Sequence, residues 1–347
     1  MRVAKLVDQK REEYGAETIV RGSDYPDMER IPSGIFALDL ATGGGFPRRR
    51  ISVIYGPEGS GKSNLALLAL AMHQRLYPDL TCVYIDLENA FDPVWAARMG
   101  VDVDRLFIVR PSHAEQAAQT LDEMLDADDI GMIVFDSLAV MTPAAVLEKD
   151  ATQKTMGGNA QVIGEMVKKT LQGLMDAEKA GRAPTIIFIN QIRHKVGVVY
   201  GDPEHMPGGF APKHAATLSI RLYSKPIMDN AISKVMPVAR ETTFVLKKAR
   251  LHALAADGKY VLITLAHDGF NVGQCDEWNT VLHYLKTAGW VVQGKGGWTL
   301  TTNGVSNTYK TLAEIKAALD SDAVGLAKLK SALIQHFREQ QVVKSAD

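Results

Sequence analysis

The sequence has little of what marks secreted or membrane-spanning proteins. It contains two cysteines, Cys82 and Cys275, which are too few for a disulfide framework and favour a reducing compartment. No apolar run comes near the roughly 18 residues that a membrane-spanning helix needs. The first residues, MRVAKLVDQKREEYG, carry scattered charges where a signal peptide has an apolar segment. We therefore expect a soluble, cytoplasmic protein with no membrane partner.

The sequence also lacks an excess of charge of one sign. Lysine and arginine number 39 and aspartate and glutamate 40, which gives a formal net charge of -1. A chain without a global positive charge has no overall preference for nucleic acid, so any nucleic-acid site must be local. Its 347 residues, 46% of them hydrophobic, are enough for one large core plus one or two small satellites.

The most informative stretch is ISVIYGPEGSGKS, residues 51–63. A β-branched apolar run precedes a glycine-rich turn of the form G-x-x-x-x-G-K-[ST], and good helix formers follow it. A chance glycine-rich loop is the alternative, but both flanks favour a strand, a phosphate-binding loop and an amphipathic helix. Such a loop directs backbone N–H groups and the positive end of the helix at one anion. The residues expected to bind ATP here are Gly56, Pro57, Glu58, Gly59, Ser60, Gly61, Lys62 and Ser63.

Two side chains of this loop have expected chemical roles. Lys62 would reach the β- and γ-phosphates of ATP, where it would support catalysis. The Ser63 hydroxyl would hold a magnesium ion that bridges the same phosphates. A triphosphate is therefore the expected ligand.

Downstream of the loop, apolar runs alternate with helical patterns. The runs lie at residues 81–87, 105–110, 131–137 and 185–191. This alternation predicts βαβ units, and hence an α/β fold with a central, mostly parallel sheet. Ligands of such sheets bind at the carboxyl ends of the strands, so the residues that follow each run are informative.

Polar residues occupy three of these strand ends. Glu88 follows the first run, where it can activate a water molecule that attacks the γ-phosphate; a helix N-cap or a solvated carboxylate is the alternative. Asp136 ends GMIVFD and fits an acid that contacts magnesium through water. Asn190 and Gln191 end another strand and can sense the γ-phosphate. The three ends together predict ATP hydrolysis.

Two long polar segments, 147–161 and 192–214, each follow a strand that is expected to contact the nucleotide. Loops of this length are usually functional or disordered, so they suggest ATP-controlled binding of a second ligand. Their basic residues make an anionic ligand the expectation, with ordinary solvated lysines as the alternative. The basic residues in question are Lys149, Lys154, Arg193 and Lys195 in these segments, and Lys168 after the first of them.

The last third of the chain changes character. Three antiparallel strands are expected at 216–224, 241–248 and 259–267. After Gly269 the pattern predicts a helix, one hairpin and two more helices, which would form a small α/β domain. Trp278, Trp290 and Trp298 are expected to form its core, and stacking on nucleic acid is the alternative.

Four segments, in this order, resemble the RecA family of homologous-recombination strand-exchange ATPases. They are IPSGIFALDLATGGGFPRRRISVIYGPEGSGKS, YIDLENAFDP, MIVFDSLAVMTP and FINQIRHKVGVVYG. The resemblance covers nearly the whole chain and is strongest at residues 31–223. It implies a P-loop RecA-like core, ATP and magnesium as cofactors, and helical filaments on single-stranded DNA. It also implies strand exchange with homologous duplex DNA, and assistance from single-strand-binding and loading proteins.

The resemblance assigns roles around the nucleotide. Glu88 matches the catalytic base, Asp136 the magnesium-contacting acid, and Gln191 the γ-phosphate sensor that couples ATP to a DNA loop. Asp92 and Trp95 match residues that contact adenine. Lys248 and Arg250 match a basic pair that reaches the ATP of the adjacent subunit.

The resemblance also assigns a DNA interface. Residues 148–157 and 192–211 match the two DNA-binding loops, in which Met156 and Val196 fall where apolar side chains wedge between base triplets. The other residues expected to bind DNA are Gly157, Lys168, Arg193, Gly208, Gly209 and Phe210.

Several positions depart from the family pattern. Gln161 stands where a DNA-contacting arginine is usual, and His214 where an aromatic interface residue is usual. Ala266 replaces the expected adenine-stacking tyrosine, and the second member of the interfacial basic pair is Arg250, which differs in donor geometry from a lysine. These departures indicate a divergent member of the family.

The expected organisation has three parts. Residues 1–30 form an N-terminal helix and polymerisation segment, residues 31–268 the ATPase core, and residues 269–347 a C-terminal α/β domain. The expected activity is that of a DNA-dependent ATPase that pairs and exchanges homologous strands in recombination and repair. A ring-forming helicase or motor of the same fold, or an ATP-gated regulator, is the alternative.

Overall fold

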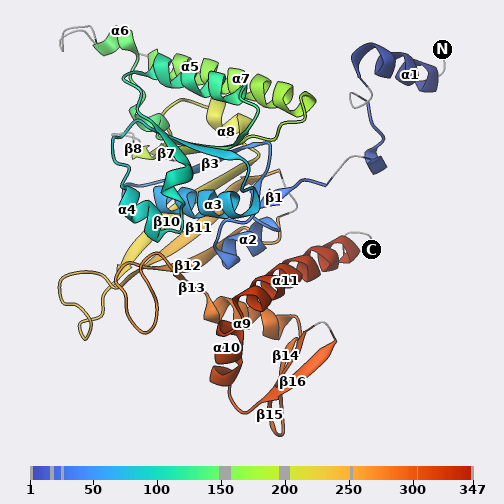
Figure 1. Cartoon of the computed structure of the whole chain (residues 1–347), viewed down its shortest axis with the longest axis vertical. Coiled ribbons are helices and arrows are strands. Elements are labelled where there is room, and N and C mark those ends of the chain that lie inside the picture. The colour runs from blue at the N-terminus through green and yellow to red at the C-terminus, as the bar shows by residue number, and fades with distance from the viewer. Residues whose placement is uncertain are drawn as a thin grey trace.

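The computed structural model describes residues 3–15, 19–24, 27–147, 158–194, 204–250, 253–302 and 304–344. Figure 1 shows a large α/β core, a smaller unit formed by the C-terminal residues, and helix α1 (Val3–Tyr14) standing away from both. No side chain of α1 is buried, and Val3 is 76% exposed. No helix among the described residues is both long enough and apolar enough to cross a membrane.

A nine-stranded sheet forms the centre of the core, in the order β13-β12-β11-β10-β3-β7-β6-β4-β5. Neighbours from β10 to β5 run parallel, whereas β11, β12 and β13 pair antiparallel. The predicted α/β fold with a mostly parallel sheet is confirmed. The strands are β3 (Ile51–Gly56), β4 (Thr81–Asp86), β5 (Leu106–Val109), β6 (Ile130–Asp136), β7 (Thr185–Gln191), β10 (Leu218–Ile227), β11 (Ala239–Ala249), β12 (Asp257–Ile263) and β13 (Cys275–Asp276).

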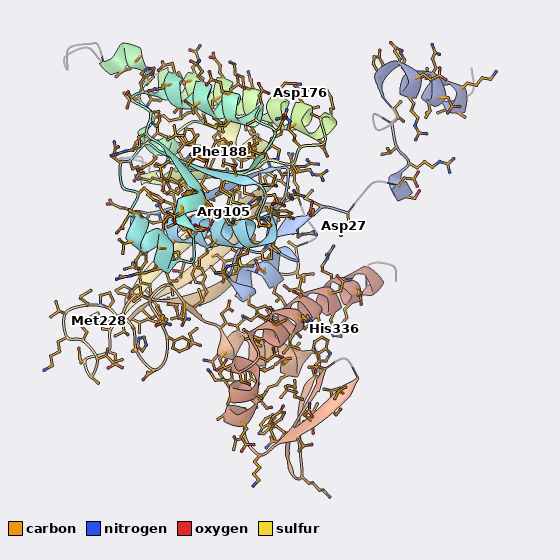
Figure 2. The ribbon with its side chains drawn as sticks, viewed as in Figure 1. Asp27, Arg105, Asp176, Phe188, Met228 and His336 are labelled. Atoms are coloured by element: carbon orange, nitrogen blue, oxygen red, sulfur yellow. The ribbon has the colours of Figure 1, made fainter. Side chains whose placement is uncertain are left out.

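Helices cover both faces of the sheet, which explains why its parallel strands read as continuous apolar runs. In β6, Met132 and Val134 pack in the cluster under α3 (Lys62–Leu76), while Phe135 packs in the cluster under α5 (Ala114–Leu125) and α7 (Gly158–Lys179). Figure 1 shows α5 and α7 together on one side of the sheet and α3 on the other. Phe188, labelled in Figure 2, packs edge-on against Phe135, with 5.7 Å between the ring centroids.

The expectation of an amphipathic helix after the phosphate loop is wrong. Residues 65–71 of α3 are all buried, and His73 behind them is fully buried as well. The reason is that α3 lies between the sheet and the chain segment around Ile31 and Leu38, so both of its sides are covered. His73 also contacts the sulfur of Cys82, with 3.4 Å from Nδ1 to Sγ, and Cys82 packs as a small buried side chain.

The three strands expected to be antiparallel need one correction. β10 pairs antiparallel with β11, but its other edge pairs parallel with β3, so that β10 belongs to the parallel sheet as well. This double pairing attaches the β10–β11–β12 extension directly to the strand that leads into the phosphate loop. Figure 2 labels Met228 beyond the end of β10, far from the helices α5 and α7.

The C-terminal unit packs around an apolar cluster that contains Leu285, Ile315 and Leu333, together with Phe36 and Leu40 of the large core. Trp278, Trp290 and Trp298 pack against it, so the expected core role of the tryptophans is confirmed. The predicted hairpin has a third strand that the sequence pattern did not indicate, because the strand is exposed along almost its whole length. The elements are α9 (Trp278–Thr287), β14 (Val291–Gly294), β15 (Gly297–Thr302), β16 (Val305–Tyr309), α10 (Leu312–Asp320) and α11 (Ala323–Lys344).

Glu277 connects this unit to the core. Its carboxylate accepts a hydrogen bond from the backbone N–H of Phe36, at the start of α2 (Phe36–Thr42), and forms an ion pair with Lys330 of α11. Asp39, on the same helix α2, is buried and accepts a hydrogen bond from the backbone N–H of Ser33 at 2.6 Å. The partly buried contacts of Glu277 thus join α2 to α11.

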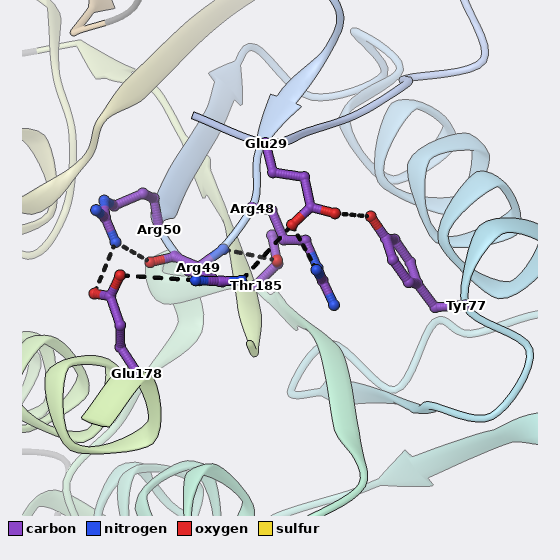
Figure 3. Close-up of polar contacts among 7 residues, drawn as sticks. All are labelled: Glu29, Arg48, Arg49, Arg50, Tyr77, Glu178 and Thr185. Carbon is purple, nitrogen blue, oxygen red and sulfur yellow. Dashed lines mark hydrogen bonds and ion pairs between the residues drawn. The ribbon is translucent and has the colours of Figure 1, made fainter. Parts of the chain in front are cut away.

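A second polar network, drawn in Figure 3, ties the segment before β1 to the edge of the core. Glu29 accepts hydrogen bonds from Tyr77 at 2.6 Å and from Arg48 at 2.5 Å. Glu178 of α7 pairs with Arg49 and Arg50. The remaining short elements are η2 (Gly22–Asp24), β1 (Arg30–Ile31), β2 (Phe46–Pro47), α4 (Pro93–Arg98), η3 (Val103–Arg105), η4 (Leu138–Val140), α6 (Ala144–Leu147), β8 (Arg193–His194), β9 (Glu204–His205) and α8 (Ala211–Ala215).

Candidate functional site

The loop between β3 and α3 has the backbone that its glycines predict. Gly59 and Gly61 adopt φ values of 68° and 87°, a region that L-residues with a Cβ rarely occupy. A Cβ on Gly56 would lie 2.4 Å from the carbonyl oxygen of Leu222, so no larger residue fits there. The three glycines therefore let the chain curl tightly over the neighbouring strand and present its N–H groups to one point.

Lys62, the first residue of α3, lies inside this curl and is buried. Its Nζ donates a hydrogen bond to the carbonyl oxygen of Pro57 at 2.8 Å, so the side chain folds back over the loop. Burial lowers the pKa of the ammonium group, while the carboxylates of Asp136 and Glu88 act in the opposite direction. A buried cation in a glycine-rich curl is suited to an anionic ligand.

Ser63 and Asp136 meet next to this cation. The Ser63 hydroxyl donates to Oδ2 of Asp136 at 2.7 Å, and the Tyr84 hydroxyl donates to the same oxygen at 2.6 Å. Burial raises the pKa of Asp136, and the two hydroxyl donors only partly oppose this effect. A buried carboxylate beside a hydroxyl is the oxygen-only donor set that Mg²⁺ prefers, so the residues fit this ion.

Glu88 and Gln191 come together although 103 residues separate them in the chain. Nε2 of Gln191 donates to Oε1 of Glu88 at 2.9 Å, and the Ser137 hydroxyl donates to the same oxygen at 2.5 Å. The strands explain the meeting, because β4, β6, β7 and β3 are neighbours whose carboxyl ends lie at one edge of the sheet. Glu88 is therefore not a helix N-cap, since Asp92 caps α4, and its exposed carboxylate is held by two hydrogen bonds.

These residues line one cavity of about 350 Å³. Its carboxylates outnumber its cations, because three acidic and two basic side chains line it among the described residues. Two of the lining residues, Asn64 and Arg240, were not singled out from the sequence. The lining residues are Glu58, Gly59, Gly61, Lys62, Ser63, Asn64, Glu88, Asp136, Gln191 and Arg240.

The two residues expected to contact adenine lie on α4, and both have partners within the chain. Asp92 caps the helix, since its Oδ1 accepts hydrogen bonds from the N–H groups of Val94 at 2.8 Å and Trp95 at 3.1 Å. Nε1 of Trp95 donates to Oδ1 of Asn64 at 2.8 Å, which fixes the indole ring next to the start of α3. The cap gives Asp92 a structural role in addition to any contact with a base.

Lys248 and Arg250 lie at the opposite edge of the sheet from the phosphate loop. In the strand register, Lys248 pairs with Ser219, which in turn pairs with Val53 near the start of β3. Nζ of Lys248 donates to the carbonyl oxygens of Lys213 at 2.8 Å and His214 at 2.7 Å. Burial lowers the pKa of Lys248, and so does the positive charge of Arg250. The basic pair therefore cannot reach the cavity of its own chain.

Several residues of the expected DNA interface lie outside the described residues, namely Met156, Gly157 and Val196, and the side chain of Arg193 is among the undescribed ones too. Among the rest, Lys168 is exposed on α7. Gly208 has φ of 87° and packs so closely on α7 that a Cβ would lie 2.8 Å from Ile163. Gly209 is exposed, and Phe210 is 75% exposed beside it. Gly209 and Phe210 are therefore accessible at the end of the second expected loop.

Two of the positions that depart from the family pattern, Gln161 and His214, have local partners. Gln161 donates to Glu165 on the exposed side of α7 at 3.0 Å. The His214 ring lies 5.9 Å from the ring of Phe210, measured between centroids.

Comparison with known proteins decides the family. The model of the RecA N-terminal domain matches residues 2–252 of this chain. The chain belongs to the RecA family. Protein RecA of Bacteroides thetaiotaomicron is 37% identical over 254 residues, which are 71% of this chain and 75% of that relative. Protein RecA of Thermotoga neapolitana is 33% identical over 305 residues, which are 84% of this chain and 85% of that relative.

The family has members beyond bacteria. The chloroplast DNA repair protein recA homolog 1 of Arabidopsis thaliana is 41% identical over 197 residues, or 57% of this chain and 43% of that relative. The family membership covers the whole nucleotide cavity, because all of its lining residues lie within the matched range.

The residues that sequence analysis missed have weak signals. Ser137 directly follows Asp136, and Tyr84 is a polar residue within an apolar strand that ends two residues later, so both could have been singled out. Asn64 directly follows Ser63. Arg240 carries no such signal, because only the pairing of β10 with β3 brings the start of β11 to the phosphate loop.

Proposed function

We propose that this RecA-family protein is a DNA-dependent ATPase that forms helical filaments on single-stranded DNA and exchanges homologous strands in recombination and repair. The observation that carries the proposal is the cavity in which a phosphate loop, a buried lysine, Asp136, Glu88 and Gln191 converge. Fold alone would not assign this activity, because one fold supports many functions. Family membership and the chemistry of the cavity together support it.

In this proposal, Glu88 is the catalytic base of ATP hydrolysis. Its carboxylate would take a proton from the water that attacks the γ-phosphate, and Ser137 and Gln191 hold it in position through two hydrogen bonds to Oε1. Lys62 would neutralise charge that develops on the phosphates, as an electrostatic clamp. The remaining loop residues would bind the phosphate chain through backbone N–H groups.

Ser63 and Asp136 would hold Mg²⁺. When bound, the ion would neutralise charge on the β- and γ-phosphates and orient them for in-line attack. The Ser63 hydroxyl would ligate it directly, and Asp136 would hold it through a water molecule. Tyr84 would keep the Asp136 carboxylate oriented, since its hydroxyl donates to Oδ2.

Trp95 and Asp92 are the residues that we propose for the adenine side of the nucleotide. The hydrogen bond from Trp95 to Asn64 holds the indole next to Ser63, so one short stretch of α3 would position both the base and the metal ion. Because Ala266 cannot stack, Trp95 would supply most of the aromatic contact to the base.

The position of Lys248 and Arg250 supports assembly into a filament. Both lie at the amino edge of the sheet, so they could neutralise the phosphates only of an adjacent subunit. ATP would then stabilise the subunit interface, because cations from two chains share its phosphates. An exposed α1, with the apolar side chains of Val3 and Leu6 facing solvent, is suited to dock on a neighbour in the same filament.

DNA binding would follow the nucleotide state through Gln191. This residue ends β7 and precedes the second expected DNA loop, 192–211, whose described part includes β8 and β9. Loss of the γ-phosphate would release Gln191 and relax the loop, which would release DNA. The first loop, 148–157, would contribute Met156 and Gly157, and the second Arg193 and Val196. Lys168, Gly208, Gly209 and Phe210 would complete the interface.

The proposal includes the three-part division at residues 30 and 268, a cytoplasmic location, and single-strand-binding and loading proteins as further partners. Most residues of the apolar cluster around which the C-terminal unit packs follow residue 268, which supports the second boundary. The two cysteines, which are free and not paired in a disulfide, are compatible with a reducing compartment.

A strand-displacement assay tests the proposal. Single-stranded DNA would be incubated with the protein, Mg²⁺ and ATP, and a labelled homologous duplex would be added. We expect displacement of the labelled strand only with homologous sequence and only with nucleotide. Displacement of a strand from a duplex that is not homologous to the single-stranded DNA would instead indicate a helicase. No displacement, together with ATP hydrolysis that does not depend on DNA, would indicate a regulator. Either result would contradict the proposal.

A further inference from the structure

Arg240 lines the nucleotide cavity, although no pattern in the sequence marks it. We propose that Arg240 binds the phosphate chain of the nucleotide held by its own subunit, on the side of the phosphate loop that carries Gly59. This inference rests on the proposed function, because it takes the cavity to bind ATP. It adds a cation from the same chain to Lys62 and to the basic pair that a neighbour would supply.

Arg240 reaches the cavity because β10 and β11 extend beyond the end of β3. Arg221 of β10 pairs with Tyr55 near the end of β3, but β10 continues to Ile227 while β3 ends at Gly56. β11 runs back along this extension, with Arg240 opposite Pro226. The first residues of β11 therefore lie beyond the end of β3, beside the loop that follows it.

Two hydrogen bonds fix the guanidinium group at the loop. Nη2 of Arg240 donates to the carbonyl oxygen of Gly59 at 3.1 Å, and Nε donates to Oγ of Ser224 at 3.1 Å. Thr242, two residues after Arg240 on β11, donates to the same hydroxyl oxygen at 3.2 Å and so holds Ser224 in place. A guanidinium group has five N–H donors, so these two contacts leave donors for a ligand.

The charge of Arg240 is not neutralised by a carboxylate among the described residues. Its neighbour Glu241 instead pairs with Lys225 at 3.0 Å and Lys259 at 3.2 Å. The side chain is half-buried and faces a cavity lined by Glu58, Glu88 and Asp136. Lys62 balances only one of these three carboxylates, so a second cation in the lining favours the binding of a triphosphate.

Arginine suits this role for two reasons. Its planar group forms paired hydrogen bonds to phosphate oxygens, and its charge is permanent at physiological pH. In contrast to Lys248 and Arg250, Arg240 is present at the cavity before any neighbour docks. We therefore expect it to contribute to nucleotide binding by single subunits as well as by filaments.

The test compares three variants with the wild type. Arg240→Gln removes the charge, and Arg240→Lys keeps it. Lys225→Gln is the matched control, since it removes one positive charge from the adjacent strand without lining the cavity. Calorimetric titration with ADP and with the non-hydrolysable analogue AMP-PNP, in Mg²⁺ and without DNA, gives the affinities. Thermal unfolding without nucleotide checks that each variant is folded.

We expect Arg240→Gln to weaken AMP-PNP binding about 10-fold or more, as the loss of a charged hydrogen bond implies. Arg240→Lys should recover part of the loss, and Lys225→Gln should bind as the wild type does. Equal affinity of Arg240→Gln and the control would overturn the inference. A loss of affinity that Arg240→Gln and Arg240→Lys share, together with a lowered unfolding temperature in both, would also overturn it, because Arg240 would then only hold the loop. A wild type that binds neither nucleotide would instead contradict the proposed function itself.

Discussion

Gln191 donates a hydrogen bond from Nε2 to Oε1 of Glu88 at 2.9 Å, and this contact joins the end of β7 to the residues that follow β4. Glu88 lines the nucleotide cavity, and Gln191 directly precedes the segment in which the second DNA loop is expected. One hydrogen bond thus joins the proposed catalytic base to the residue before the expected DNA loop. A change at either end of this contact can be transmitted without movement of the sheet.

Replacement of Glu88 by glutamine should abolish hydrolysis but not ATP binding. The amide cannot accept the proton of the attacking water, and general bases contribute about 100-fold or more to the rate. Ser137→Ala is the matched control, because it removes one hydrogen bond to Glu88 and leaves the carboxylate. Phosphate release in the presence of single-stranded DNA measures both. An inactive Ser137→Ala variant beside an active Glu88→Gln variant would contradict the assignment of Glu88 as the catalytic base.

The pair Ser63 and Tyr84 allows a matched test of the magnesium site. Both hydroxyls donate to Oδ2 of Asp136, but only Ser63 belongs to the phosphate loop. We expect Ser63→Ala to raise the Mg²⁺ concentration for half-maximal hydrolysis by about 10-fold, since it removes a direct ligand. Tyr84→Phe should leave this concentration nearly unchanged. Equal shifts in both variants would show that the hydroxyls serve Asp136 and not the ion.

Lys62 lies in the cavity of its own subunit, and Arg250 is proposed to act on the cavity of a neighbour. Two inactive variants, one at each residue, should therefore restore activity when they are mixed. Lys62→Ala damages the cavity of its own subunit, and Arg250→Ala the contribution to a neighbour. In an equimolar mixture, about a quarter of the interfaces would combine an intact cavity with an intact Arg250, if the filament mixes subunits randomly. ATP hydrolysis by the mixture should therefore rise toward a quarter of the wild-type rate, while each variant alone stays inactive. A mixture as inactive as its components would place both residues in one chain's site.

Much of the fold could be predicted because parallel strands covered on both faces appear as apolar runs. The runs before Asp86, Asp136 and Gln191 all form adjacent strands of the central sheet. The sequence did not reveal that β10 pairs with β3 as well as with β11, since residue alternation reports the burial of a strand and not its partners. It also did not reveal β16, whose side chains are almost all exposed.

Apart from the phosphate loop, the sequence predicted only those cavity residues that follow the ends of parallel strands. Glu88, Asp136 and Gln191 follow apolar runs, so the rule for parallel sheets brings them together. Arg240 enters from an overhanging antiparallel strand, to which that rule does not apply. The cap formed by Asp92 was missed because the sequence could not say whether its carboxylate faces the helix or a ligand.

The buried carboxyl of Asp39 predicts a pH dependence of stability. Burial raises the pKa of Asp39 to about 7 from an ordinary value of 3.8, and nearby Glu277 acts in the same direction. Because the folded protein binds this proton more tightly than the unfolded chain does, the contribution of Asp39 to stability should fall as pH rises from about 4 to about 7. The loss is at most about 4 kcal/mol, since a tenfold change in proton affinity is worth ~1.4 kcal/mol.

Asp39→Asn tests this dependence, because asparagine still accepts the hydrogen bond from Ser33 but carries no charge. We expect the variant to be more stable than the wild type at pH 8, with a smaller difference at pH 5. Urea unfolding at the two pH values measures this. A difference that does not change with pH would contradict the assignment of the ionisation to Asp39.

The central claim is that ATP hydrolysis and DNA binding are coupled through Gln191. The most direct measurement is the rate of ATP hydrolysis with and without single-stranded DNA, for the wild type, Gln191→Ala and Arg193→Ala. We expect DNA to stimulate the wild type strongly, and both variants to lose that stimulation while they still bind ATP. Hydrolysis by the wild type at the same rate with and without DNA would contradict this claim.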